Sequence, residues 1–279
     1  MHKTIPEITF IVLTYNEAIN LPHLLNNISG FAKDVLILDS YSTDKTVEIA
    51  ESHGAKVFFR EFDDFSMQRN YALENLPIQT EWIFFIDADE MLTNDLKNEI
   101  CLKLNETKVD GFYIKRRFYW KGKWIKHGYY PIWLLRLGRY GKIKCDSRPI
   151  NEHLICSNDN VDKLQNDFLD YNRKNLSDWI AKHNNYSDRE AIQLINRDTN
   201  DKGKFFGNQY ERKRWFRQHV WLKLPPLIRP LIYFLYRYFL RLGFLDGKEG
   251  FMYHFMHAFI YRIIIDFKYL EKKWFNEKK

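Results

Sequence analysis

Two aspartates separated by one small residue stand at the end of an apolar run. Residues 84–90 read Phe-Phe-Ile-Asp-Ala-Asp-Glu, so Asp87 and Asp89 flank Ala88. Ionised carboxylates are unfavourable beside a core unless they are paired or bound to a cation. Hard divalent cations such as Mg²⁺ and Mn²⁺ take oxygen ligands and often join one or two carboxylates to substrate phosphates. The motif therefore suggests metal-assisted chemistry at a phosphate. The alternative is that the two aspartates cap a helix expected from Asn94.

The elements that position this motif alternate between strand and helix over the first hundred residues. Apolar runs predict strands at 9–14, 35–38, 56–59 and 82–86, and amphipathic patterns predict helices at 21–28, 65–76 and 94–104, with another beginning near Thr43. The runs are continuously apolar rather than alternating, which is typical of strands buried on both faces. We therefore predict an α/β fold with a mostly parallel, twisted sheet between flanking helices.

A polar cluster follows three of these strands. The clusters are Tyr15-Asn16-Glu17, Asp39-Ser40 and Asp87-Ala88-Asp89. Ligands of such sheets bind beyond the carboxyl ends of the strands. All three clusters are therefore expected to serve one site.

The pattern changes after Gly111. Residues 112–117, 132–137 and 150–155 look like strands with no helix between them. A mixed or antiparallel region is therefore expected to complete the sheet.

A charge imbalance marks a second region of the chain. Residues 201–279 hold 17 Lys and Arg against 7 Asp and Glu, a net charge of +10, whereas the whole chain carries +7. The polar, Gly-containing stretch 198–204 follows a helix predicted at 176–195 and is a candidate boundary. We therefore predict a catalytic domain at 1–200 and a basic, aromatic-rich helical appendage at 201–279. A solvated charged surface would also explain the imbalance.

Taken together, the clusters resemble the motifs of family-2 glycosyltransferases of the GT-A fold. The resemblance rests on Thr14-Tyr15-Asn16-Glu17 after the first strand, on Asp39-Ser40 and the following Ser42-Thr43-Asp44 after the second, and on Asp87-Ala88-Asp89 after the fourth. It covers about residues 7–155. It implies a GT-A-like sheet, a nucleotide-sugar donor and a divalent metal, Mg²⁺ or Mn²⁺.

The resemblance assigns the nucleotide to the first two clusters. Thr14, Tyr15 and Glu17 match the loop that holds the nucleotide. Asp39 matches the acid that hydrogen-bonds the base, and Ser40 belongs to the same binding segment. The expected donor is a UDP-hexose, and no residue distinguishes glucose from galactose or N-acetylglucosamine.

The resemblance assigns the diphosphate and the metal to the third cluster. Asp87 matches the acid near the ribose and the metal, Asp89 matches the metal ligand that bridges the diphosphate, and Ala88 lies between them. A bound cation stabilises the charge that the departing nucleoside diphosphate gains. Gln68 and Arg69 fall where this group often contacts the donor, although Arg69 would equally suit the surface of a helix.

The acceptor hydroxyl needs a general base on the side of the sugar away from the diphosphate. A single in-line displacement then inverts the anomeric centre. Residues 148–154, Arg-Pro-Ile-Asn-Glu-His-Leu, resemble a segment of lipopolysaccharide-core glucosyltransferases, which implies Glu152 as the base. Asp146 is the competing carboxylate. His153 is predicted as a helper of the base or as a metal ligand beside Asp87 and Asp89, and a partly buried histidine is the alternative.

A charged residue interrupts the apolar strand predicted at 132–137. Arg136 is expected to reach a carboxylate or the donor phosphates, because a guanidinium is costly to bury without a partner. Aromatic rings nearby can stack on sugar faces, and core packing explains Trp133 and Leu135 equally well.

The appendage mixes basic side chains with aromatic ones. Phe251–Phe275 reads as a long helix, and residues 243–251 resemble the tail of the same lipopolysaccharide-core group. Basic residues beside aromatic ones suit helices that lie in an anionic membrane interface. A lipid-linked acceptor would explain such a tail. The alternative is a helical pair that packs on the catalytic domain or on a second subunit.

The cysteine content and the distribution of apolar residues indicate the cellular compartment. The three cysteines, Cys101, Cys145 and Cys156, form neither a disulfide framework nor a zinc-ligand spacing, so a reducing compartment is expected. No stretch approaches the roughly 20 apolar residues of a spanning helix, and no signal region opens the chain. We therefore expect a cytoplasmic protein, peripheral on the inner face of the cytoplasmic membrane.

Two acceptors and two other functions stay open at this point. The first acceptor is a lipopolysaccharide inner-core sugar, and the second is a polyprenyl phosphate. A sugar nucleotidyltransferase would normally open with a Gly-rich phosphate loop where Tyr15-Asn16-Glu17 stands. A nucleic-acid-binding module would use the basic aromatic tail, but the chain has no recognised nucleic-acid motif. The expected partners are a UDP-sugar, a membrane-linked acceptor and an anionic membrane, with a homo-oligomer as an option.

Overall fold

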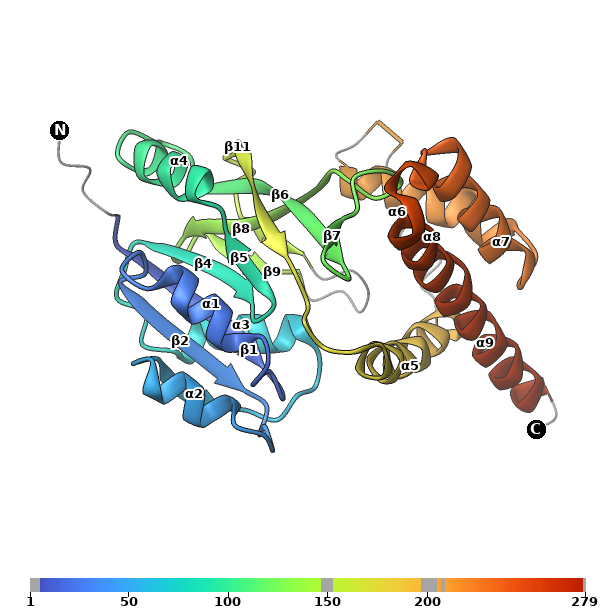
Figure 1. Cartoon of the computed structure of the whole chain (residues 1–279), viewed down its shortest axis with the longest axis horizontal. Helices are drawn as coiled ribbons and strands as arrows, with labels where there is room; N and C mark the ends of the chain where they lie inside the picture. Colours follow the sequence, from blue (N-terminus) through green and yellow to red (C-terminus); the bar gives the residue numbers. More distant parts are fainter. Residues whose placement is uncertain (1–5, 147–152, 197–204, 207–208, 278–279) are drawn as a thin grey trace. The chain divides into compact units, whose positions relative to one another are not determined.

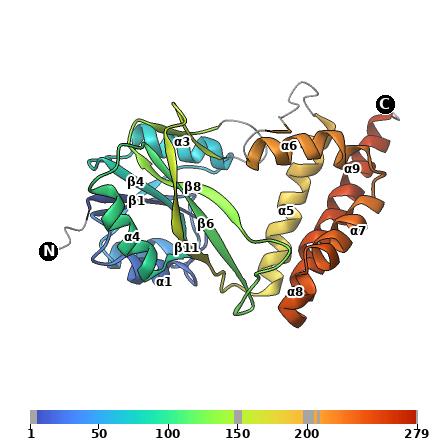
Figure 2. The same cartoon turned by 90° about the horizontal axis from the view of Figure 1, so that it is seen from above.

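The protein forms two compact units. The computed structural model describes residues 6–146, 153–196, 205–206 and 209–277. The first unit contains the chain up to Lys126 together with Tyr130–Lys174, and the second contains His127–Tyr129 together with the chain from Asn175 onward. In Figures 1 and 2 the first unit runs from blue through green to yellow, and most of the second is dark yellow, orange or red. The first unit mixes strands and helices, whereas the elements of the second are helical.

The first unit is built on one twisted sheet (Figure 1). Its strands in the described part of the chain are β1 (Ile8–Thr14), β2 (Asp34–Asp39), β3 (Lys56–Phe59), β4 (Trp82–Asp87), β5 (Glu90–Leu92), β6 (Gly111–Trp120), β7 (Lys123–Trp124), β8 (Ile132–Arg139) and β11 (Val161–Asp170). The strand order is β3-β2-β1-β4-β8-β6-β11-β5, with β7 beside β6. β1 is parallel to β2 and β4, and β8 pairs antiparallel with β4 and β6. The predicted α/β fold with a mostly parallel sheet and a later mixed region is therefore confirmed.

Helices cover both faces of this sheet. α1 (Leu21–Ile28), α2 (Thr46–Ser52) and α4 (Asn94–Leu104) pack on one face, and α3 (Phe65–Asn75) packs on the other. Neighbouring residues of a strand point to opposite faces, so a strand covered on both sides must be apolar throughout. This is why the sequence shows continuous apolar runs here.

The strand residues themselves show this alternation. Phe10 of β1 and Phe84 of β4 lie in the core on one face, where their rings stack with centroids 5.2 Å apart. Their chain neighbours Ile11 and Phe85 lie in the core on the other face. All four side chains are buried, so the two cores fix the position of β1 beside β4.

The residue that caps α4 is Thr93. Its side chain accepts a hydrogen bond from the backbone N–H of Leu96 at 3.2 Å. A threonine in this place satisfies one of the free N–H groups of the first helical turn. Helix capping is therefore not the role of Asp87 and Asp89.

β11 is a strand that the sequence did not predict. Most of its residues are polar, and its buried side chains are Leu164, Asp167, Phe168 and Asp170. The strand nevertheless lies inside the sheet, parallel to β6 on one side and antiparallel to β5 on the other. Its two acidic buried residues are paired with arginine or lysine side chains of β6, which is how polar side chains are accommodated there.

A separate antiparallel pair is formed by β9 (Ile143–Cys145) and β10 (Leu154–Cys156). The strand predicted at 150–155 corresponds to β10 in its last residues. Residues 150–152, with Glu152 among them, lie outside the described residues.

The second unit consists of helices. They are α5 (Leu176–Ile195), α6 (Gln209–His219), η1 (Trp221–Lys223), α7 (Ile228–Leu235), η2 (Tyr236–Leu240), η3 (Gly243–Asp246), α8 (Gly247–His254), η4 (Phe255–Ile260) and α9 (Tyr261–Glu277). α5 packs along α9, so the structure divides the chain at Asn175, whereas we predicted a division at residue 200. The long helix predicted at 251–275 is part of the continuous run from α8 through η4 to α9. Within the described residues, none of the helices has both the length and the apolar content that crossing a membrane requires.

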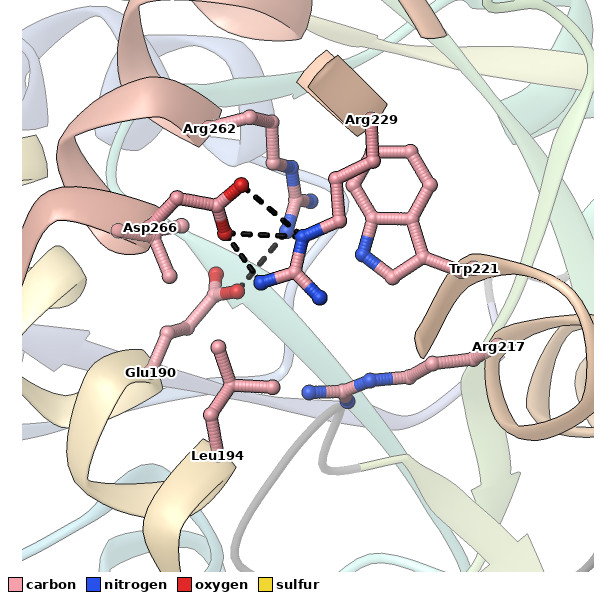
Figure 3. Close-up of a pocket in the computed structure, with 8 residues that line it drawn as sticks. Glu190, Leu194, Arg217, Trp221, Arg229, Arg262 and Asp266 are labelled. Atoms are coloured by element: carbon pink, nitrogen blue, oxygen red, sulfur yellow. Dashed lines mark hydrogen bonds and ion pairs between the residues drawn. The ribbon is translucent and has the colours of Figure 1, made fainter. Parts of the chain in front are cut away.

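A buried ion pair joins the start of α7 to α9. Arg229 donates to both carboxylate oxygens of Asp266, from Nε at 2.9 and 3.0 Å and also from Nη2. The backbone N–H of Leu227 donates to the same carboxylate at 2.9 Å. The two side chains are only 4% and 3% exposed, and Figure 3 shows them beside Arg262 and Trp221. Each charge therefore depends on the other, because water reaches neither.

We expect Asp266→Ala to lower the free energy of unfolding by about 3–5 kcal/mol, because it leaves the Arg229 guanidinium buried without its counter-ion. The double variant Arg229→Met/Asp266→Leu should lose less than Asp266→Ala alone, since it removes both charges. Urea unfolding followed by circular dichroism measures both losses. Lys33→Ala, which removes the exposed pair with Glu7, is the control and should change little. A double variant less stable than the single one would contradict this account.

Candidate active site

The carboxyl ends of β1, β2 and β4 lie side by side in the sheet. Thr14 pairs with Asp39 across β1 and β2, and Leu13 pairs with Asp87 across β1 and β4. Parallel strands present their carboxyl ends in the same direction, so these registers bring the three polar clusters to one end of the sheet.

Asp39 ties the ends of β1 and β2 together. Its carboxylate accepts hydrogen bonds from the Thr14 hydroxyl at 2.6 Å and from the Ser42 backbone N–H and hydroxyl, each at 2.7 Å. The side chain is fully buried, and these donors satisfy it without water. A nucleotide base would have to exchange one of these bonds to reach Asp39. Base recognition by Asp39 therefore stays a prediction.

The loop after β1 is fastened to the loop after β2. Asn16 has a positive φ of 53°, its N–H donates to the Ser42 hydroxyl at 2.8 Å, and its side-chain oxygen accepts from the Thr43 N–H at 2.8 Å. The N–H of Glu17 donates to the Thr46 hydroxyl at 2.7 Å. The two loops therefore form one rigid surface.

Two tyrosines stand out from this surface. Tyr15 is 57% exposed and Tyr41 is 56% exposed, although both follow buried strands. The Tyr41 ring stacks on Phe59 of β3 with centroids 5.6 Å apart, which fixes its position. Exposed aromatic rings held in this way offer flat apolar surfaces to a planar or sugar-bearing ligand.

Arg136 holds the acidic residues at the end of β4. Its Nη2 donates to Asp87 Oδ2 at 2.9 Å and to Glu90 Oε1 at 2.6 Å, and Glu90 Oε2 accepts the Asp87 backbone N–H at 2.9 Å. The sequence left a carboxylate and the donor phosphates as alternatives for Arg136, and the structure shows two carboxylates. Glu90 was not predicted as a site residue, although it is the last residue of the same Asp-Ala-Asp-Glu segment.

Burial makes this cluster sensitive to charge. Desolvation raises the pKa of Glu90 well above its ordinary value, and the charges of Asp87 and Asp170 act in the same direction, while Arg136 opposes them. Burial also disfavours the charged form of Arg136, but Asp87 and Glu90 outweigh it and raise its pKa. Asp87 is the member that reaches solvent, with 42% of its side chain exposed against 6% for Arg136 and 1% for Glu90. It is therefore the carboxylate that a ligand can meet.

The two predicted donor contacts on α3 lie against this region. Arg69 Nη2 lies 3.7 Å from Asp87 Oδ1, and only 12% of its side chain is exposed. Arg69 is therefore not a simple surface residue of α3. Gln68 is buried, and its Nε2 donates to the Ser40 hydroxyl at 3.3 Å and to the Glu61 carbonyl at 2.9 Å. Gln68 thus positions the loop of Ser40 from within.

The segment after β11 completes the surroundings of Asp89. The Asn172 side chain donates to Asp89 Oδ2 at 2.8 Å, and Lys174 Nζ donates to Glu17 Oε1 at 2.6 Å. Asn20 bridges the two through Glu17 Oε2 at 2.8 Å and Asn172 Oδ1 at 3.3 Å. Neither Asn172 nor Lys174 was predicted from the sequence. Their only signal was a polar run between a predicted helix and an unrecognised strand.

The oxygen atoms around Asp89 are of the kind that bind a divalent cation. Burial raises the pKa of Glu17, and the nearby charge of Asp89 raises it further, against the opposing contacts of Lys174 and Asn20. A cation at Asp89 would relieve this repulsion, and Mg²⁺ and Mn²⁺ prefer carboxylate oxygens. Ala88, between the two aspartates, is buried, and its small side chain leaves room for the side chains of Asp87 and Asp89 at the end of the strand.

The residues predicted to supply or assist the general base are Glu152, Asp146 and His153. Glu152 lies outside the described residues, and its neighbours Asp146 and His153 face each other across the β9–β10 pair, where the Asp146 N–H donates to the His153 carbonyl at 3.0 Å. Among the residues that the structure describes, no three His, Cys, Asp or Glu side chains are grouped so as to hold a metal ion. The structure therefore does not bring His153 together with Asp87 and Asp89 as a third metal ligand.

Comparison with known proteins links these loops to one family. The family model described as glycosyl transferase family 2 matches residues 9–157. An uncharacterized glycosyltransferase of Rickettsia typhi, RT0209, is 23% identical over 265 residues, which cover 91% of this chain and 83% of that protein. The glycosyltransferase SunS of Bacillus phage SPbeta is 36% identical over 99 residues, 34% of this chain and 23% of SunS. The crystal structure of Staphylococcus aureus TarS 1-349 in complex with UDP-GlcNAc has a TM-score of 0.48 at 13% identity, with 97% of this chain and 92% of that one covered.

The raised pKa of Glu17 predicts a pH dependence. A carboxyl group whose folded pKa is raised contributes stability that is fully present below its unfolded value of about 4.5 and is lost as the pH rises through the folded value. Glu17→Gln cannot ionise, so its free energy of unfolding should rise relative to that of the wild type as the pH increases above the ordinary glutamate pKa of about 4.5. Urea unfolding at several pH values measures this difference. Parallel pH curves for the two proteins would show that neither burial nor the charge of Asp89 raises the pKa of Glu17.

Proposed function

Because the chain belongs to glycosyl transferase family 2, we propose that it transfers a hexose from a UDP-sugar to an acceptor hydroxyl, with inversion at the anomeric carbon. The observation that carries this proposal is the junction of three loops at the ends of β1, β2 and β4, where the carboxylates of Asp87 and Asp89 stand beside a loop surface fixed by Asp39 and Asn16. Membership of this family favours group transfer over the nucleotide-sugar synthesis and the nucleic-acid binding that the sequence left open.

The acidic residues at the end of β4 are the groups that would hold Mg²⁺ or Mn²⁺. Asp89 and the exposed side of Asp87 would supply carboxylate oxygens. When bound, the cation would stabilise the negative charge that gathers on the departing diphosphate. Arg69, 3.7 Å from Asp87, would meet phosphate oxygens, and the rings of Tyr15 and Tyr41 would pack on the base and ribose.

The transfer would be a single displacement. The acceptor oxygen forms a bond to the anomeric carbon while the bond from that carbon to the diphosphate oxygen breaks, and its electron pair leaves with UDP. The hydroxyl proton passes to a carboxylate on the opposite side of the sugar, which we assign to Glu152. This assignment comes from the resemblance of residues 148–154, and Asp146 is the alternative.

We propose a lipopolysaccharide inner-core sugar as the acceptor, with a polyprenyl phosphate as the second choice. The support is the resemblance of residues 148–154 and 243–251 to lipopolysaccharide-core glucosyltransferases. Such an acceptor is anchored in lipid, so the reaction would take place at the inner face of the cytoplasmic membrane.

A screen of UDP-glucose, UDP-galactose and UDP-GlcNAc with Mn²⁺ or Mg²⁺, following release of UDP, tests the donor and the metal together. We expect Asp89→Asn to lower turnover with the accepted donor by about 100-fold or more, because the variant loses the charge that would hold the cation. Calorimetry should show that UDP binding no longer depends on Mn²⁺. Asp95→Asn, an exposed aspartate on α4, is the matched control and should behave as wild type. Near-normal turnover of Asp89→Asn would overturn the metal role.

The general base is tested by a second pair of variants. Glu152→Gln should bind UDP in the presence of Mn²⁺ as the wild type does and should lose turnover by about 10²–10⁴-fold, because only proton removal from the acceptor is lost. Asp146→Asn should keep most of the turnover. The reverse result, in which Asp146→Asn is inactive and Glu152→Gln is active, would move the base to Asp146.

A further inference from the structure

In α7 and η2, charged side chains are buried and apolar side chains are exposed, the reverse of the usual arrangement. Their buried side chains include Arg229 and Arg237, which are 3% and 1% exposed. Their exposed positions carry apolar side chains at helical spacing: Ile228, Leu231, Ile232, Leu235, Tyr236, Phe239 and Leu240. A helix that faces water normally shows the opposite pattern, with its apolar stripe toward the core. The exposed side of this segment is therefore suited to contact with an apolar partner.

The buried arginines fix this orientation. Arg229 is held by its ion pair with Asp266. The guanidinium carbon of Arg237 lies 4.8, 5.5 and 5.3 Å from the ring centroids of Tyr129, Tyr233 and Tyr253. Turning the segment over would break these contacts and leave buried carboxylate and aromatic groups without their cations. The apolar side chains therefore stay outside.

The apolar surface continues onto η3 and α8. The Tyr238 ring contacts Phe244 and Phe251, with centroids 6.3 and 5.6 Å apart, so these segments lie beside η2. The exposed apolar side chains there are Leu242, Phe244, Leu245, Phe251 and Met252. We call the exposed apolar side chains of residues 228–252 the apolar face.

The exposed charges along the apolar face are basic. Between residues 228 and 252 the exposed charged residues are Arg241 and Lys248, while Asp246 is buried and Glu249 is largely covered. We call Arg241 and Lys248 the basic rim of this face. If a second copy of the chain packed on the face by two-fold symmetry, the basic rims of the two copies would lie close together and repel each other. Anionic lipid headgroups complement the rim instead, and the acyl boundary complements the apolar side chains.

We propose that the apolar face is the surface by which the protein docks on an anionic membrane, with its side chains in the headgroup and acyl boundary and with Arg241 and Lys248 at the lipid phosphates. The inference deepens the proposed function, because a lipid-anchored acceptor has to be met at a membrane. Docking needs neither donor nor acceptor, so a binding assay without substrates separates a failure of this inference from a failure of the proposed reaction.

The test is co-flotation of the full chain with vesicles of phosphatidylcholine containing about one third phosphatidylglycerol. Phe239→Ser/Leu240→Ser should lower the partition coefficient by at least about tenfold, because it removes buried apolar area from the bound state. Leu102→Ser/Tyr140→Ser, which removes exposed apolar side chains from the first unit, is the matched control and should bind as wild type. Thermal unfolding checks that the changes, all at exposed positions, leave the fold intact.

A second variant tests the basic rim. Arg241→Gln/Lys248→Gln should weaken binding to the anionic vesicles by about fivefold per residue and leave binding to pure phosphatidylcholine unchanged. Wild-type protein that fails to float with anionic vesicles would overturn the proposal, as would equal binding by Phe239→Ser/Leu240→Ser. A wild-type dimer in light scattering that this variant converts to a monomer, without vesicle binding by either, would identify the apolar face as a self-association surface instead.

Discussion

Carboxylates crowd one end of the sheet, and the first unit depends on the cations that hold them there. Arg136 joins Asp87 to Glu90, and Lys174 joins Glu17 to the segment after β11. A buried carboxylate without such a partner would cost several kcal/mol or take up a proton. The cations therefore decide which acidic oxygens point inward and which remain available. Asp87 is left half exposed because Glu90 occupies the inner side of Arg136.

The mixed half of the sheet brings these cations to the acidic residues. Arg136 comes from β8 and Lys174 from the segment after β11, although Asp87 at the end of β4 and Glu17 in the loop after β1 belong to the parallel half of the sheet. The antiparallel pairing of β8 with β4 brings the first cation to the end of β4. The pairing of β11 with β5 brings the second toward the loop of Asp89. Without the mixed half, Asp87 and Glu17 would lose these two cations, although Arg69 of α3 would still lie 3.7 Å from Asp87.

The parallel half could be predicted from the sequence because its strands are buried on both faces and therefore read as continuous apolar runs. The three clusters at its carboxyl end followed from that topology. β11 could not be predicted, since a strand whose polar side chains are neutralised by partners far away in the chain looks like a loop. Asn172 and Lys174 were missed for the same reason, because their contacts with Asp89 and Glu17 exist only once β11 is in place. The burial of Asp39 was also hidden, because it depends on the Thr14 and Ser42 hydroxyls that close around it.

Buried arginines also determine which side chains are exposed in the second unit. Arg136 is buried to serve the acids of a site, whereas Arg229 and Arg237 are buried so that apolar side chains remain outside. The buried charges of residues 201–279 cancel, because Arg229 and Arg237 are balanced by Asp246 and Asp266, so the net charge of +10 is carried by the other residues of this segment. A solvated charged surface would explain this net charge, but it does not explain the exposed apolar side chains of residues 228–252. Recognition by this unit has to be reasoned from its exposed apolar side chains first and from its few exposed cations second.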